Sequence, residues 1–155
     1  MHNKIFKYLL LHFIMQVIGF NLTKMSGEKL QEIVAARPNT SIEFTNLQKE
    51  KFELLKDSEA IKISFKYSVA YEDSERKKDT PQSNILIEGH IVLSVSKDES
   101  KEITKAWKKK KLPPNLNLHL FNLILRRCTP KAIFLEDEIA LPFHTPMPRL
   151  SPKKE

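Results

Sequence analysis

Two runs of alternating apolar residues between Ile61 and Val95 constrain the fold of this chain most. In the first run, every second side chain from Ile61 to Tyr71 is aliphatic or aromatic, with mainly Lys and Ser between them. The second run, Ile85 to Val95, follows the same rule with Gly89 among the apolar positions. This period of two, with β-branched and aromatic residues, is typical of strands that bury one face. The polar connection between the runs then predicts a long antiparallel hairpin with one apolar face.

Two shorter runs precede this hairpin and predict two further strands. Met15–Lys24 alternates in the same way and predicts the first strand. Ser26–Lys29 is turn-like, and the Pro38-Asn39 pair is a second turn signal. Thr40–Leu47 then predicts a second strand, placed at an edge of the sheet.

Residues 1–14 have a sequence unlike the rest of the chain. Lys4 and Lys7 precede the apolar run Tyr8–Phe20, which superficially resembles a signal peptide or membrane anchor. The run is too short to cross a bilayer and lacks a small-x-small cleavage site. We therefore expect either an N-terminal extension outside the fold, with Met15 as a natural start, or a short helix packed on the sheet.

The apolar period becomes helical after Val95. Ser96 and Glu99 have the spacing of a capping box, and the four lysines Lys108–Lys111 suit the negative end of a helix dipole. A second helix is expected over Asn115–Cys128, which is apolar around more than half of its circumference and would need cover on two sides. A second subunit is the natural cover.

The chain is expected to continue with Thr129 as a cap and Pro130 at the first position of a last helix, Lys131–Leu141. Prolines recur through Pro142–Glu155, which is therefore expected to be extended. Together the elements predict an α+β fold: four strands that form a sheet, followed by two main helices packed on one face. We expect one domain over residues 15–150 and a disordered tail over 151–155.

The charge of the chain lies mainly in its C-terminal third. The formal net charge is +7, and from Lys97 onward 13 Lys and Arg residues face 7 Asp and Glu residues. Such a cluster suits phosphate backbones, although a solvated helix face is the simpler interpretation. The basic patch predicted here consists of Lys105, Lys108, Lys109, Lys110, Lys111, Arg126, Arg127 and Lys131.

The sequence offers little for catalysis. Its five histidines are scattered without metal-ligand spacing, and His90 is expected on the solvated face of its strand. The single cysteine, Cys128, is expected to be a buried structural thiol in a reducing, cytoplasmic compartment. Glu136-Asp137-Glu138 is expected to be a solvated acidic turn. No phosphate-binding, zinc-protease or nucleophile-elbow motif is present, so we predict a binding protein that is not an enzyme and uses no cofactor or metal.

The predicted order of four strands, two helices and a proline-marked tail resembles the SecB-like chaperones. Residues 60–71 and 84–95 are similar to the central hairpin of that family. Leu120–Cys128 is similar to its interface helix, including a cysteine at a similar place, and Leu141–Pro148 is similar to its segment after the helix.

The resemblance implies that the four strands form an antiparallel Greek-key sheet. It also implies a homo-oligomer, a dimer or tetramer, that holds unfolded or nascent polypeptides without ATP and serves protein export. By position, it implies a polypeptide-binding apolar groove lined by Phe44, Phe65, Tyr67, Tyr71, Leu120, Phe121 and Ile124. The alternative is that these stripes are ordinary core and subunit interface.

The basic patch supports a different hypothesis. A ribosome-associated or rRNA-binding structural protein would use its lysines to hold phosphates. A third, weaker hypothesis is a protein at the membrane periphery that uses residues 4–20, without stable insertion.

Overall fold

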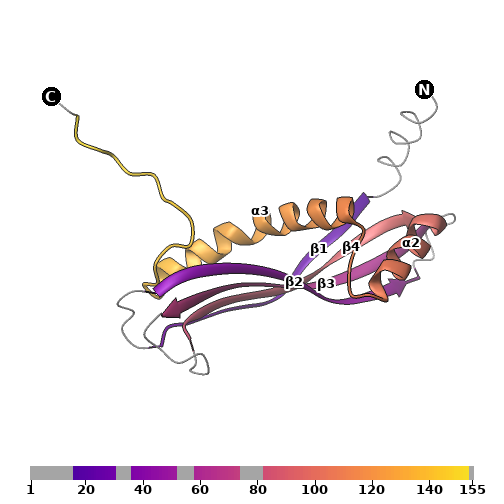
Figure 1. The fold of residues 1–155 in the computed structure, drawn as a ribbon, viewed down its shortest axis with the longest axis horizontal. Helices are drawn as coiled ribbons and strands as arrows, with labels where there is room; N and C mark the ends of the chain where they lie inside the picture. Colours follow the sequence, from indigo (N-terminus) through magenta and orange to yellow (C-terminus); the bar gives the residue numbers. More distant parts are fainter. Residues whose placement is uncertain (1–15, 31–35, 52–57, 74–81, 154–155) are drawn as a thin grey trace.

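The computed structural model describes residues 16–30, 36–51, 58–73 and 82–153. Four strands, β1 (Gln16–Glu28), β2 (Ala36–Glu50), β3 (Ser58–Asp73) and β4 (Asn84–Ser96), are followed by two helices, α2 (Lys97–Trp107) and α3 (Pro114–Glu138) (Figure 1). The predicted α+β fold is confirmed. Residues 1–14, for which we predicted an extension, lie outside the described residues.

The strands form one antiparallel sheet in the order β1-β4-β3-β2. Strands β2, β3 and β4 are consecutive neighbours, and β1 lies beside β4 at the far edge. This is a Greek-key arrangement, as predicted. The predicted edge position of β2 is also correct, and β1 forms the other edge of the described sheet.

The two turns predicted from short polar segments are wrong. Gly27 belongs to β1 and pairs with Ile85, and Pro38 belongs to β2 and pairs with Tyr71. A proline cannot donate to a strand ladder, but an edge strand needs no donor on its open side. The long partner strands therefore override the local turn signals.

Gly89 permits a close approach of β1 to β4. A Cβ atom at this position would lie 2.3 Å from the Asn21 carbonyl oxygen and 3.1 Å from Phe65 Cζ. The β1–β4 register shifts between Leu22 and Lys24, next to this site. Glycine therefore interrupts the apolar alternation of β4 at residue 89, because no side chain fits between the β1 backbone and Phe65 there.

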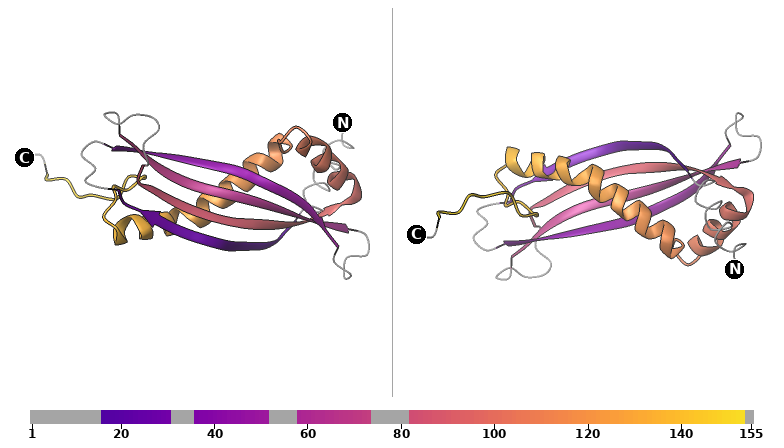
Figure 2. Two further views of the ribbon diagram at one scale, coloured as in Figure 1. Left: turned by 90° about the horizontal axis from the view of Figure 1, so that it is seen from below. Right: turned by 90° about the horizontal axis from the view of Figure 1, so that it is seen from above.

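The two faces of the sheet differ in chemistry. Both helices lie on the same side of it, and the view from below shows the strands in front of α3 (Figure 2). On the open face, the Ser41 and Ser68 hydroxyls lie 2.7 Å apart, and His90 lies 3.3 Å from the Asn21 side-chain amide. The expected solvated, hydrogen-bonded His90 is confirmed. The covered face holds the apolar core, built around the alternating residues of β3 and β4.

Helix α3 is continuous, so the predicted break at Thr129–Pro130 is wrong. Pro130 lies inside the helix and is exposed, as is Arg126 one turn earlier. Pro130 leaves the Arg126 carbonyl without its helical donor, and water can reach that carbonyl because both residues face solvent. A line of buried residues four apart runs past the proline on the opposite side: Leu116, Leu120, Ile124, Cys128, Ala132 and Glu136.

Ser96 caps α2 as predicted, whereas the reciprocal half of the capping box is replaced by another contact. The Ser96 hydroxyl accepts the Glu99 backbone N–H at 3.2 Å, and it donates to the Glu99 carboxylate at 3.1 Å, the group that was expected to bond to the Ser96 backbone N–H. The prediction for the cysteine is confirmed. Cys128 is a buried free thiol. Burial raises its pKa to about 11, although Lys131 and Arg127 oppose this shift. The thiol is therefore protonated and structural at neutral pH.

Candidate functional site

Helix α3 crosses the sheet diagonally, from the β2 side to the β1 side (Figure 2). In its first half, Phe121 stacks on Phe44 of β2, with ring centroids 5.2 Å apart. Just beyond its end, the side chain of Ile139 comes so close to β1 that a Cβ on Gly27 would lie 3.0 Å from it. A diagonal helix leaves part of the apolar face uncovered along each flank, and each flank contains a hollow.

The β2 hollow lies between the edge strand β2 and the start of α3. It has a volume of about 790 Å³. The stacked rings of Phe44 and Phe121 give it an apolar wall, while Lys110, Lys111 and Glu43 lie on its rim with charges of both signs. The complete lining is Ile42, Glu43, Phe44, Thr45, Lys110, Lys111, Leu112, Pro114, Asn117 and Phe121.

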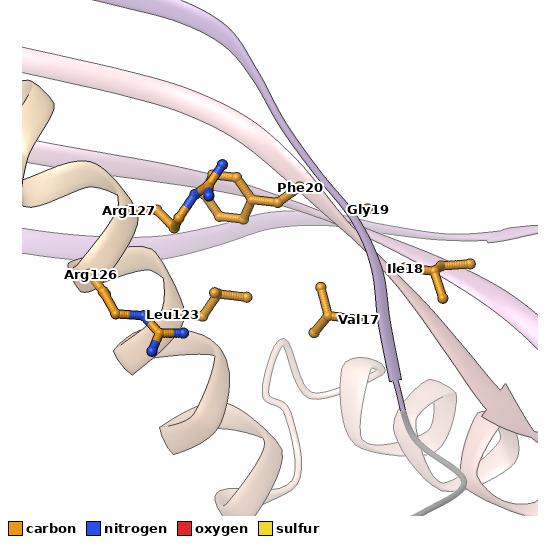
Figure 3. A pocket seen from close by; sticks show the side chains of 7 residues that line it. All are labelled: Val17, Ile18, Gly19, Phe20, Leu123, Arg126 and Arg127. Atoms are coloured by element: carbon orange, nitrogen blue, oxygen red, sulfur yellow. The ribbon is translucent and has the colours of Figure 1, made fainter.

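The β1 hollow lies on the opposite flank, between β1 and the middle of α3 (Figure 3). Its volume is about 620 Å³. The guanidinium of Arg127 lies 5.0 Å from the centroid of the Phe20 ring, which in turn packs on Phe65 of the core. The lining residues are Val17, Ile18, Gly19, Phe20, Leu123, Arg126 and Arg127, and no carboxylate is among them.

The structure divides the seven residues of the predicted groove. Phe44 and Phe121 lie together in the β2 hollow. The other five are at most 2% exposed and form the core beneath α3: Phe65, Tyr67, Tyr71, Leu120 and Ile124. They support the hollows from below and do not form a groove in this chain. Sequence reasoning missed the β1 hollow, although the alternation that predicted the first strand already included Phe20.

The predicted basic patch is divided as well. Lys105 and Lys108–Lys111 are exposed at the end of α2 and in the turn after it, where Lys110 lies 5.2 Å from the Trp107 ring centroid. Arg126 lies on the middle of α3, about 18 Å along the helix axis from Pro114. Arg126 and Arg127 belong to the β1 hollow, and Lys131 follows one turn later. The eight cations thus form two groups with different neighbours.

Several large apolar side chains are exposed on α3 and on the tail. Leu118 is 63% exposed and Phe134 is 59% exposed. Met147 and Leu150 of the tail are also exposed. The prediction of an apolar helix that needs cover on two sides is consistent with the exposed residues of α3, because the sheet covers only one side of the helix.

A buried polar cluster, the tail anchor, fixes the chain after α3 and was missed by sequence reasoning. The prediction that Glu136 is solvated is wrong, because its side chain is fully buried. Asp137 and Glu138 are exposed, as predicted. The Tyr71 hydroxyl donates to Glu136 Oε2 at 2.6 Å, and the His144 backbone N–H donates to the same oxygen at 2.8 Å.

The His144 ring completes the tail anchor. Its Nδ1 contacts Glu136 Oε1, and its Nε2 lies 2.9 Å from the Tyr67 hydroxyl. Burial raises the pKa of Tyr67, and burial together with the Glu136 carboxylate raises the pKa of Tyr71, so both hydroxyls remain donors at neutral pH. Since Glu136 is fully buried and both tyrosines are at most 2% exposed, the cluster fastens the tail to the sheet from within the core.

The end of α3 explains why Glu136 is buried. Ala140 has φ 52°, and the Leu141 N–H donates to the Glu136 carbonyl at 2.8 Å. This left-handed turn reverses the chain and brings His144 back over the last helical turns. The sequence does contain a signal for this cluster: Glu136 continues the line of residues four apart that the helix buries, and His144 follows it by eight residues.

Comparisons of the chain with protein-family models, with curated proteins and with solved structures found no match. Within residues 16–30, 36–51, 58–73 and 82–153, no helix has the length and apolarity to cross a membrane. The same residues contain no group of three or more His, Cys, Asp and Glu side chains placed to hold a metal ion.

Proposed function

We propose that this chain is an ATP-independent holdase that binds unfolded or nascent polypeptides. The observation that carries the proposal is the placement of apolar surface around α3. Two hollows with apolar walls flank the helix, and Leu118 and Phe134 are exposed on the helix itself. Exposed apolar surface gathered around one element marks an interaction site.

The geometry suits a partner without fixed structure. Burying apolar surface contributes about 25 cal/mol per Å². Each hollow can take only a few side chains of a client, so binding at either one is weak. A flexible polypeptide can reach several such sites at once, and the second contact then benefits from a high effective concentration. Weak, repeated and sequence-tolerant contacts are what a holdase needs.

The order of elements supports a SecB-like chaperone. That resemblance implied a Greek-key sheet with helices on one face, and the described residues have this arrangement. A homo-oligomer would cover exposed side chains of α3 such as Leu118 and Phe134, leaving the flanking hollows for clients. A cytoplasmic location and a role in protein export belong to the same proposal.

The test is suppression of aggregation without nucleotide. A denatured model client is diluted into buffer with the full chain, and light scattering is followed. The variant Phe44→Thr/Phe121→Ala removes the stacked pair and is expected to lose most of the suppression. Asn46→Thr/Asn122→Ala changes the same strand and helix without removing apolar surface, and is expected to behave like the wild type. Circular dichroism checks the fold of both variants. A wild-type chain that leaves aggregation unchanged at molar excess would refute the proposal.

The exposed lysines after α2 favour a second candidate function. Lys108–Lys111 are all exposed, and Lys110 adopts φ 57° in the turn that carries them. Such a group suits a phosphate backbone, as in rRNA on a ribosome. This candidate predicts co-sedimentation with ribosomes that is lost at high salt and on replacing Lys108–Lys111 by Glu. If that variant still co-sediments with ribosomes at low salt, these lysines do not bind the ribosome.

A further inference from the structure

We propose that the β1 hollow binds extended polypeptide segments in which a carboxylate side chain lies two residues from a large apolar one. The inference rests on the proposed polypeptide binding and names the class of segment that one of its sites selects. It follows from the charge, the floor and the open edge of this hollow.

The charge of the β1 hollow has one sign. Arg126 and Arg127 are both exposed at its rim, and no carboxylate lines it. In the described part of the chain, the ion pairs involve Lys49, Lys62 and His144, and neither arginine. A guanidinium binds a carboxylate with two parallel hydrogen bonds, so two neighbouring arginines without an ion pair to any described residue are suited to that group.

The floor of the hollow is apolar and lies directly beside the arginines. In Figure 3, Val17 and Leu123 point toward one another near Arg126, whereas Ile18 points away. Arg127 lies over the face of Phe20, and this cation–π contact holds the guanidinium at the edge of the hollow. An apolar side chain can therefore enter between Val17 and Leu123 with a carboxylate within reach of the arginines.

The open edge of β1 sets the expected spacing. Among residues 16–30, 36–51, 58–73 and 82–153, β1 pairs with β4 alone, so an extended peptide can add to its other edge through backbone N–H and C=O groups. In an extended chain, residues i and i+2 point to the same side and are separated by about 7 Å. An apolar residue on the floor thus places the side chain two positions away near the arginine rim.

The β2 hollow provides the contrast that makes this a selective site. Its rim carries Glu43 beside Lys110 and Lys111, so it offers no uniform charge to a client. We expect acidic segments to favour the β1 hollow and the β2 hollow to be indifferent to client charge. Nucleic acid is disfavoured at the β1 hollow, because two arginines around an apolar floor offer few phosphate contacts.

The experiment measures binding of fluorescent peptides to the full chain by anisotropy. Three matched peptides carry Leu-x-Glu, Leu-x-Gln or Leu-x-Lys at their centre. We expect the wild type to bind the Glu peptide about tenfold more tightly than the Gln peptide, the size expected for one charge-assisted contact. The preference is expected to shrink as salt rises. Arg126→Gln/Arg127→Gln should abolish it, whereas Lys105→Gln/Lys108→Gln, which removes the same charge elsewhere, should leave it unchanged.

The outcomes separate this inference from the proposed function. If the wild type binds none of the peptides, polypeptide binding itself fails. If it binds all three equally, or if the arginine variant keeps the preference, only the present inference is overturned. A single-stranded oligonucleotide that displaces the Glu peptide would point to a general anion site and contradict the inference. A change of molecular mass in the arginine variant, measured by light scattering, would show a second copy in the hollow and also contradict it.

Discussion

The two ends of α3 are held to the sheet by different interactions. At the first end, the buried line consists of large aliphatic side chains, Leu116, Leu120 and Ile124, that pack on the apolar core. At the second end, the line becomes smaller and then polar, and its last member, Glu136, bonds to Tyr71 and to the tail. One end therefore depends on buried area and the other on directed hydrogen bonds.

The difference shows how a diagonal helix can be both tightly packed and fixed in position. Apolar contacts are non-directional, so aliphatic side chains stabilise the first end without specifying where the following chain must go. A buried carboxylate is costly unless its partners are placed correctly, so Glu136 tolerates only one course for the tail. The second end should thus be more sensitive to changes of single polar atoms and to pH.

The largest effect is expected from a truncation at the first end. Leu120→Ala removes a fully buried side chain and leaves a cavity, so it should lower the free energy of unfolding by about 2–5 kcal/mol. Urea denaturation followed by circular dichroism measures this loss. Leu118→Ala, two positions away and 63% exposed, should change stability by less than about 0.5 kcal/mol. Equal losses in the two variants would contradict the assignment of Leu120 to the core.

A smaller loss is expected from a change of one polar group at the second end. Glu136→Gln keeps the size of the side chain but replaces a carboxylate, which only accepts hydrogen bonds, with an amide that has one accepting oxygen. The amide NH₂ group would then face a donor of Tyr71 or His144, and that hydrogen bond would be lost. We expect a loss of about 1–3 kcal/mol in the free energy of unfolding, measured by the same denaturation.

The comparison predicts a second, local consequence of Glu136→Gln. The tail should be released more readily, and limited trypsin cleavage at Arg149 should become faster than in the wild type. Glu138→Gln makes the same chemical change at an exposed position of the same helical turn and should leave both stability and cleavage unchanged. Unchanged cleavage in Glu136→Gln would show that the carboxylate does not hold the tail.

Alkaline pH should weaken the second end in particular. The pKa of Cys128 is raised from 9.0 to about 11 in the folded chain, so its contribution to stability is complete below pH 9 and is lost as pH rises. By pH 10 this loss is about 1.4 kcal/mol, and the raised pKa of Tyr71 adds to it in the same direction. Thermal unfolding between pH 8 and pH 10 measures the slope. Cys128→Ala should flatten it, and an unchanged slope in that variant would exclude the thiol as a contributor.

Much of the fold could be predicted from period alone. The alternation of β3 and β4 fixes both their type and their buried face, because a shift of one residue would expose every apolar side chain. The start of α2 at Ser96 was also predicted correctly, because a capping hydroxyl acts on amides only a few residues away. Pro130 was misread, because a proline on the exposed side of a long helix leaves its free carbonyl to water, and a one-dimensional reading does not show which side is exposed.

The candidate site was harder to predict, because it depends on where α3 crosses the sheet. The crossing direction decides that Phe44 and Phe121 meet and that Tyr67 and Leu120 are covered. The same direction brings Arg126 to β1 and separates it from the lysines after α2. The tail anchor depends on a chain reversal at Ala140, a residue type that rarely adopts a left-handed conformation and therefore gives no turn signal.

The smallest expected effect is a gain of stability at this reversal. Ala140 has φ 52°, a conformation that costs a residue with a Cβ about 1 kcal/mol and costs glycine much less. Ala140→Gly should therefore raise the free energy of unfolding by about 0.5–1 kcal/mol, measured by urea denaturation. The gain should be local, so hydrogen exchange of the Leu141 and His144 amides should slow more than that of Leu120.

Ala132→Gly is the matched control for the reversal, since it makes the same substitution on the buried line of the same helix. There the residue is helical and buried, so glycine adds conformational freedom to the unfolded chain and also removes a buried methyl group, and stability should fall by about 1–2 kcal/mol. The opposite signs of the two substitutions distinguish a left-handed turn from a helix that continues through residue 140. If both variants were destabilised equally, Ala140 would not adopt a left-handed conformation. The chain reversal that places His144 over Glu136 would then be contradicted.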